Sequence, residues 1–295
     1  MHSLTFRLPS IPERRLRKLI PLLVFLASSS LSGAAPPPAP KIVNAAPHET
    51  EDGPPLARGS QFQSSETVFY SFQVSSYAES PLKQVRLSYK IEAFDPHGVP
   101  IVEPIESVFD ATLHDEDKRW MPKLRAPLAI PSVAPSGTYK IVTRVTDDIS
   151  HLTTTAETTF EVAGHDVPAS PDLIIRNLTF HRTDEDSHPL PVAAYRPGDT
   201  VFARFDIAGF RYAAANTIHV FYDVAVLNPA AKQIYTQPHA AEDRSFSFYP
   251  KPYVPGQMSL QLQKNMRPGE YTVVLTAHDE VGHQIAELRR PFAVE

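Results

Sequence analysis

The sequence has no cysteine, a single tryptophan and only eleven glycines among 295 residues. The lack of cysteine excludes disulfide bonds, thiol catalysis and zinc sites with cysteine ligands. Three motifs of common enzyme classes are missing too: the glycine-rich loop that binds phosphates, the nucleophile elbow of serine hydrolases and the helical histidine pair of zinc proteases. From these absences we expect a protein that is not an enzyme.

Long hydrophobic runs are also missing. The main apolar stretch, Leu19–Leu31, is interrupted by Pro21 and diluted by serines, and it is shorter than the roughly 20 apolar residues that span a bilayer. It follows a basic segment and precedes small residues, which is the order typical of a secretory signal peptide. We predict a signal peptide at residues 1–34 that is cleaved after Ala34. The mature protein is then expected to be secreted or periplasmic, without stable insertion in a membrane.

Positive charge is scarce: 28 Lys and Arg stand against 33 Asp and Glu, which gives a net charge of −5. Five of the basic residues lie in the predicted signal peptide, so the mature chain would be more acidic still. Binding to nucleic acid requires basic side chains that contact phosphates. We therefore expect no nucleic-acid partner.

The most informative feature that the chain does have is an internal repeat with an offset of 132 to 133 residues. Three segments recur: Val68–Val74 as Val201–Ile207, Gln84–Pro96 as Thr217–Pro229, and Gly137–Asp147 as Gly269–Asp279. The third match is shifted by one residue relative to the other two, as a single loop deletion would do. A repeat of this kind predicts two homologous domains.

Proline and glycine mark the borders of these domains. Residues 35–40 are almost entirely proline and alanine, a composition that forms an extended spacer. Residues 164–171 combine glycine, two prolines and small polar residues, which indicates a linker. We expect the signal peptide at 1–34, the spacer at 35–40, one domain at 41–163, the linker at 164–171 and a second domain at 172–295.

Within each copy the apolar residues alternate with polar ones. In the segment 84–96, Val85, Leu87 and Ile91 alternate with charged and polar residues, and the counterpart that begins at Ile218 keeps the same phase. This period of two is typical of a strand with one buried face. No segment shows a convincing helical period, and thirty prolines suit many short strands joined by turns. The sequence predicts an all-β fold of antiparallel sandwiches.

Two short motifs, Pro135–Tyr139 and Arg267–Tyr271, resemble the tyrosine corner before the sixth strand of immunoglobulin-like and fibronectin type III-like sandwiches. Each is followed by an alternating strand, an acidic turn and a last strand. The resemblance covers nearly all of the chain after residue 40, although the paired cysteines and core tryptophan of antibody domains are absent. It implies two tandem immunoglobulin-like modules of the bacterial kind, and it identifies no functional residues, because this fold serves many functions.

Acidic residues lie between the last two strands of each copy, Asp147 and Asp148 in the first and Asp279 and Glu280 in the second. Calcium prefers several hard oxygen ligands, so these four residues are candidate metal ligands. Aspartate also favours tight turns because its side chain bonds the nearby backbone, and a purely structural role is the alternative. Apart from calcium, we expect no cofactor.

Aromatic residues beside prolines precede the fifth strand of each copy, and the candidate ligand-binding residues are Trp120, Phe246, Tyr249 and Tyr253. Exposed aromatic rings held by rigid prolines are common at recognition surfaces. The alternative is that these rings fold over the edge of a sandwich and cover its core. Both readings are open at the level of the sequence.

The function that we expect is an exported, non-enzymatic binding or structural module of the cell envelope or extracellular space. Its partner would be a protein or a polysaccharide of unknown identity. Three alternatives remain: a carbohydrate-binding protein that uses the aromatic loops, a periplasmic chaperone or assembly factor with an open edge strand, and a spacer stiffened by calcium at the acidic turns.

Overall fold

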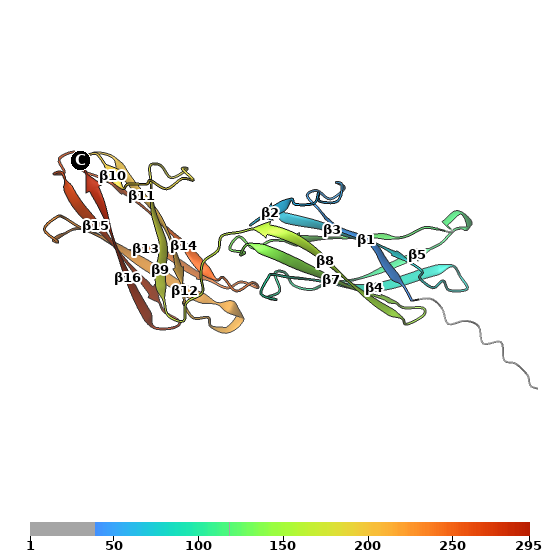
Figure 1. The fold of residues 1–295 in the computed structure, drawn as a ribbon. Helices are drawn as coiled ribbons and strands as arrows, with labels where there is room; N and C mark the ends of the chain where they lie inside the picture. The colour runs from blue at the N-terminus through green and yellow to red at the C-terminus, as the bar shows by residue number, and fades with distance from the viewer. Residues whose placement is uncertain (1–38, 118) are drawn as a thin grey trace, which may run out of the picture. The chain divides into compact units, whose positions relative to one another are not determined.

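The computed structural model describes residues 39–117 and 119–295. The predicted signal peptide at 1–34 and most of the spacer at 35–40 lie outside the described residues. The described chain consists of strands and turns with two short 3₁₀ helices, η1 (Asp115–Asp117) and η2 (Ala214–Asn216) (Figure 1).

The first eight strands form a three-stranded and a five-stranded sheet, which we call the first sheet pair. The three-stranded sheet has the order β1-β3-β6 and the five-stranded sheet the order β2-β8-β7-β4-β5. The strands are β1 (Lys41–His48), β2 (Gln61–Gln63), β3 (Thr67–Ser75), β4 (Gln84–Phe94), β5 (Ile105–Thr112), β6 (Lys123–Ala129), β7 (Gly137–Asp147) and β8 (Thr153–Ala163).

The last eight strands form the second sheet pair with the same pattern of neighbours. Its three-stranded sheet has the order β14-β11-β9 and its five-stranded sheet the order β10-β16-β15-β12-β13. The strands are β9 (Ile174–His181), β10 (Ala194–Tyr195), β11 (Thr200–Ala208), β12 (Ile218–Leu227), β13 (Gln233–Ser245), β14 (Tyr253–Gln261), β15 (Gly269–Asp279) and β16 (Gln284–Val294).

The pairing of strands is almost entirely antiparallel. The exceptions are two short parallel pairs, β2 with β8 and β10 with β16, which occupy matching places in the two sheet pairs. The expectation of an all-β fold with several antiparallel sheets is therefore confirmed.

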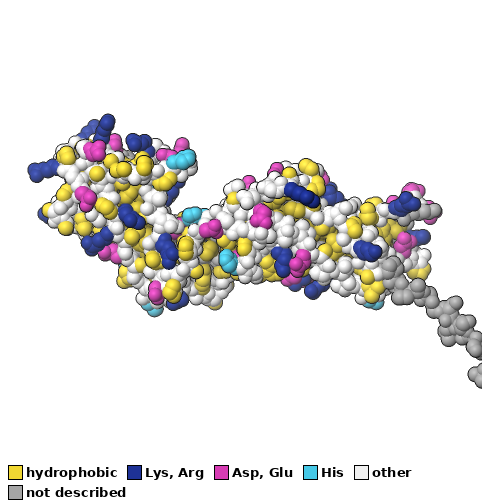
Figure 2. Space-filling model, viewed as in Figure 1, with side chains coloured by type: hydrophobic (Ala, Val, Ile, Leu, Met, Phe, Trp, Pro, Cys, Tyr) yellow, Lys and Arg dark blue, Asp and Glu magenta, His cyan; other side chains and the backbone are white. Residues whose placement is uncertain are grey.

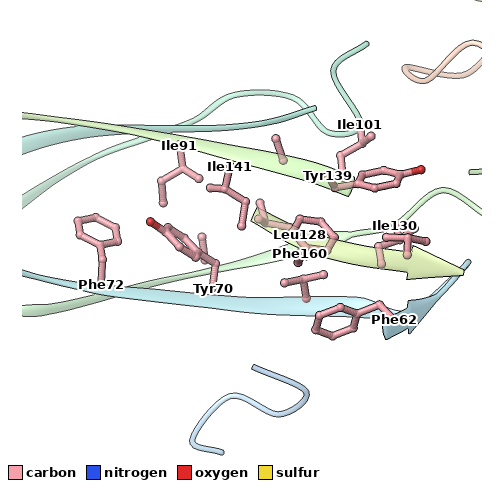
Figure 3. Packing of buried hydrophobic residues seen from close by; sticks show 14 of the residues in the cluster. Phe62, Tyr70, Phe72, Ile91, Ile101, Leu128, Ile130, Tyr139, Ile141 and Phe160 are labelled. Carbon is pink, nitrogen blue, oxygen red and sulfur yellow. The ribbon is translucent and has the colours of Figure 1, made fainter. Parts of the chain in front are cut away.

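The core of the first sheet pair lies between its two sheets. The alternation predicted for 84–96 is present in β4, where Val85, Leu87 and Ile91 are buried. Tyr70 of β3 reaches across to the other sheet, and its hydroxyl is 2.8 Å from Thr143 Oγ1 of β7. Figure 3 shows how rings from β2, β3 and β8 pack with aliphatic side chains from β4, β6 and β7. The period of two in the sequence thus places one face of each strand in a shared apolar core.

The second sheet pair has its own core, which contains the buried side chains of Ile218, Val220 and Val224 of β12. The tyrosine motifs behave alike in both pairs. The Tyr139 hydroxyl donates to the Pro135 carbonyl at 2.9 Å, and the Tyr271 hydroxyl donates to the Arg267 carbonyl at 3.0 Å. Each tyrosine therefore ties the first residues of its strand, β7 or β15, to the backbone carbonyl four positions before the tyrosine.

The surface of the described chain mixes acidic, basic and apolar side chains without a continuous patch of one charge on the face shown in Figure 2. Among residues 39–117 and 119–295, no helix has the length and apolar character needed to cross a membrane.

Candidate functional site

The acidic turn of the first sheet pair is built around a buried carboxylate. Asp147 is fully buried at the end of β7. Its Oδ2 accepts the Ala78 amide at 2.6 Å, and its Oδ1 accepts the amides of Ile149 at 2.9 Å and Ser150 at 3.2 Å. Three backbone donors that would otherwise be unpaired are satisfied by one side chain. Asp147 thus ties the turn after β7 to the loop after β3.

Asp279 repeats this arrangement at the end of β15. Its Oδ2 accepts the Arg211 amide at 2.8 Å, and its Oδ1 accepts the amides of Val281 and Gly282, both at 3.0 Å. The two aspartates therefore do the same structural work in the two sheet pairs.

The neighbouring acids do not accept the turn amides. Asp148 Oδ2 accepts the hydroxyl of Ser88 at 2.8 Å and lies 3.5 Å from Arg86 Nε, and Glu280 is exposed. Within the described residues, no group of three or more histidine, aspartate or glutamate side chains is placed to hold a metal ion. Calcium binding at these four acids stays a prediction. The side-chain oxygens of the two buried acids, Asp147 and Asp279, accept hydrogen bonds from backbone amides.

The four candidate aromatic residues divide into two exposed and two buried side chains. Trp120 is 40% exposed and Phe246 79% exposed, whereas Tyr249 and Tyr253 are buried. Trp120 leans against Phe109, with the ring centroids 5.7 Å apart. The structure therefore does not bring the four rings together as one exposed platform.

The two buried tyrosines come from the second sheet pair but pack with the core of the first. Tyr249, Tyr253 and Ala208 belong to the buried cluster whose other buried members come from the strands and loops of the first sheet pair. The Tyr249 hydroxyl donates to Asp95 Oδ2 at 2.9 Å. Burial, and then the hydrogen bond and the charge of Asp95, raise the pKa of Tyr249 well above its usual range. The phenol thus stays neutral and keeps donating to the carboxylate.

A second contact lies beside Tyr253. His165 Nε2 is 2.8 Å from Asp206 Oδ2, and the same oxygen accepts Asn177 Nδ2 at 2.7 Å. The His165 ring meets the Tyr253 ring edge-on, with centroids 5.2 Å apart. Burial, together with the charges of Asp206 and Asp166, raises the pKa of Tyr253 to about 12. We call Asp95, Tyr249, Tyr253, His165 and Asp206 the joint.

Sequence reasoning identified Tyr249 and Tyr253 as candidate ligand-binding residues, with covering of the core as the alternative. It missed Asp95, His165 and Asp206. The sequence contains one signal that could have identified Asp95. In the aligned repeat its equivalent is Asn228, so the first copy has a carboxylate where the second has an amide.

Comparison with known proteins assigns the chain to no family. No family model matches the chain, and no curated protein matches it. Among solved structures, the chain is similar to the crystal structure of red sea bream transglutaminase, with a TM-score of 0.25 and 8% sequence identity over 80% of this chain. The chain spans about 30% of the length of that structure. A similarity at this level supports no statement about activity.

One expectation needs correction, namely that the chain is not an enzyme. The transglutaminase is an enzyme, although the similarity to it assigns no activity to this chain. Missing motifs were the whole basis of that expectation, and sites built from residues far apart in the sequence have no motif. We withdraw it.

Proposed function

We propose that the chain is an exported binding or structural module of the cell envelope or extracellular space, built from two tandem immunoglobulin-like sandwiches at residues 41–163 and 172–295. The sequence repeat, the matching strand orders and the two tyrosine corners support this reading of the domains. Export rests on the predicted signal peptide. Its partner is a protein or a polysaccharide.

The joint is the observation that carries the structural part of the proposal. Two sandwiches joined only by a flexible linker would not bury a carboxylate and a phenol against each other, because each loses its water on burial. The Asp95–Tyr249 hydrogen bond offsets that cost. A module held in this way keeps its two sandwiches at a fixed spacing.

The rival function, an assembly factor that accepts a partner's strand, requires an uninterrupted edge strand. β13 lies at the edge of its sheet, and a groove of about 220 Å³ runs beside it. However, Pro238 lacks an amide hydrogen, and the pairing with β12 shifts register between Tyr222 and Val224. Proline and bulges are devices that keep edge strands from pairing, so we favour the first function.

Electron–electron distance measurement tests the joint directly. Because the chain has no cysteine, spin labels can be attached at Val108→Cys and Ile285→Cys, both exposed positions in different sheet pairs. We expect a narrow distance distribution that broadens in the Tyr249→Ala variant. Phe246→Ala, which removes an exposed ring from the same loop, is the matched control and should leave the distribution narrow.

A distribution that is equally broad with and without Tyr249 would contradict the joint. Export is tested separately by fractionation of bacterial cells that produce the full chain, followed by mass spectrometry of its N-terminus. Recovery of the uncleaved chain in the cytoplasm would contradict that part of the proposal.

A further inference from the structure

The second sheet pair contains a cleft of about 890 Å³ on its three-stranded sheet and around the edge strand β14. Its walls come from β9, β11, β12, β13 and β14, with His165 from the segment between β8 and β9 and Ser187 and Pro189 from the segment between β9 and β10. On the first sheet pair, the hollow over β3 and β6 is only about 190 Å³. A cleft of the larger size is typical of sites for small ligands.

A histidine at the same repeat position distinguishes the two sheet pairs. His48 and His181 each end the first strand of their pair and are buried. His48 has both ring nitrogens engaged: Nε2 lies 2.8 Å from Ser71 Oγ, and Nδ1 lies 2.9 Å from the Gly53 carbonyl. The ring of His48 is therefore a satisfied structural group.

His181 is only 4% exposed and is one of the residues that line the cleft, and its Nδ1 atom is itself buried. Its Nε2 lies 3.0 Å from Thr179 Oγ1, but its Nδ1 has no hydrogen-bond partner in the part of the chain that the structure describes. If the threonine hydroxyl donates to Nε2, the proton sits on Nδ1, which is then a free donor. Buried donors without a partner are rare in proteins and call for one.

The repeat position that supplies the hydrogen-bond partner of His48 also differs, and in the second pair it lies opposite Thr179. Where the first copy has Ser71, the second has Arg204, which lines the cleft. The guanidinium donates to the backbone carbonyls of Asp184 and Asp186. Among the described residues, no carboxylate lies within ion-pair distance of Arg204, whereas Arg125 on the same face of the first sheet pair is 2.7 Å from Asp52. The positive charge of Arg204 is thus held in place without a compensating acid.

Three acids also line the cleft, and each has a hydrogen-bond or ion-pair partner of its own. Asp206 accepts His165 and Asn177, Glu242 accepts two histidines, and Asp243 accepts Lys251 at 2.7 Å. The group that complements an uncompensated arginine is an anion with two oxygens, since a carboxylate takes parallel hydrogen bonds from a guanidinium group. An imidazole N–H is a further donor that such an anion can accept. Apolar walls from residues such as Tyr222 and Val254 would contact the rest of the ligand.

We propose that this cleft binds a small molecule with a carboxylate group, an acidic sugar or a short organic acid, through Arg204 and His181. The inference names a ligand class for the binding module proposed above, and it rests on that proposal only in expecting the second sheet pair to bind a ligand. Export and the Asp95–Tyr249 hydrogen bond do not enter into it, although His165, Asp206 and Tyr253 of the joint also line the cleft.

Calorimetric titration of the purified chain from residue 35 tests the proposal. The probes are galacturonate, its neutral counterpart galactose, and propionate. We expect galacturonate to bind at least tenfold more tightly than galactose. Binding of propionate as well would show that the carboxylate alone suffices, and its absence would show that the sugar ring contributes. No binding of either acid, or equal binding of galactose, would overturn the proposal.

Two matched variants locate the site. Arg204→Gln should weaken galacturonate binding at least tenfold, whereas Arg125→Gln, which removes the same charge from the same face of the first sheet pair, should leave it unchanged. An equal loss in both variants would mean a general charge effect and would overturn the assignment.

Arg204→Gln could loosen the loop whose carbonyls it holds, so a measurement on the unmodified chain is also needed. Galacturonate should shift the ¹⁵N resonance of His181 Nδ1 and leave that of His48 in place. A constant His181 resonance at saturation would exclude this cleft. These measurements use the purified chain without spin labels. A negative binding result therefore does not contradict the distance or export results, and a negative distance or export result does not contradict ligand binding.

Discussion

In the first sheet pair, Asp95 Oδ1 accepts two backbone amides of its own turn, and in the second pair Asn228 Oδ1 does the same. Either side chain meets the need of the turn, since both offer one carbonyl-type oxygen. Only aspartate has a second acceptor, and Asp95 uses it for the Tyr249 hydroxyl. The difference between the copies separates what the fold requires from what the joint requires.

Other repeat positions also divide into those where the two copies agree and those where they differ. Asp147 and Asp279 are identical in residue type and in hydrogen bonding, because both turns need the same three amides satisfied. Ser71 and Arg204 occupy one repeat position with different side chains, and there the surfaces differ. Repeat positions that agree therefore serve the fold, and repeat positions that disagree are the places to look for function.

The largest effect is expected when the shared carboxylate is removed. Asp147→Ala and Asp279→Ala each leave three buried amides without an acceptor and should each lower the free energy of unfolding by about 3 kcal/mol. Chemical denaturation measures this. Trp120 is the only tryptophan, so its fluorescence follows the first sheet pair, while circular dichroism follows both.

We expect Asp147→Ala to shift the fluorescence transition to lower denaturant concentration. Asp279→Ala should shift the part of the dichroism transition that reports the second sheet pair. Asp148→Ala, whose side chain bonds Ser88 and Arg86 rather than the turn amides, is the control and should cost less than about 1 kcal/mol. If millimolar calcium rescued either large loss, the carboxylates would be metal ligands and the structural reading would fail.

Much of the fold was predictable because it depends on local patterns. The period of two in 84–96 and from Ile218, the repeat offset and the tyrosine motifs all concern residues near each other in the sequence, and the structure bears out strands and tyrosine hydrogen bonds at these places. The joint was not predictable in this way, since Asp95 and Tyr249 are 154 residues apart. Burial of Tyr249 depends on a surface that only the folded first sheet pair provides.

A smaller effect is expected at two glycines that begin β7 and β15. Gly137 has φ +137° and Gly269 has φ +152°, and a Cβ added there would lie 2.8 Å from Pro96 Cγ or 2.7 Å from Pro229 Cγ. Strain and overlap together should cost about 2 kcal/mol in each alanine variant, measured by the same denaturation. Gly59→Ala, with φ +84° but nothing within 4 Å, isolates the strain and should cost about 1 kcal/mol. Unequal losses at Gly137 and Gly269 would break the equivalence of the two turns.

The smallest effect is expected from exchanging the residues that differ. Asp95→Asn keeps the turn acceptor but replaces the oxygen that accepts Tyr249, so it should cost about 1 kcal/mol. Asn228→Asp, in a turn with no phenol to bind, should change stability by less than about 0.5 kcal/mol. A loss of equal size in both variants would assign the effect to the turns and not to the joint.

Tyrosine absorbance against pH gives the exchange a sharper readout. Asp95 contributes to the raised pKa of Tyr249, so Asp95→Asn should lower that pKa, and Asn228→Asp should not. A tyrosine with a raised pKa in the folded state adds stability that is complete below pH 10 and is lost as the pH rises toward the folded pKa. The unmodified protein should therefore lose more stability than Asp95→Asn between pH 9 and about 11. If both lost the same amount, the charge of Asp95 would not act on Tyr249, and the difference between the two copies at this position would have no consequence for the joint.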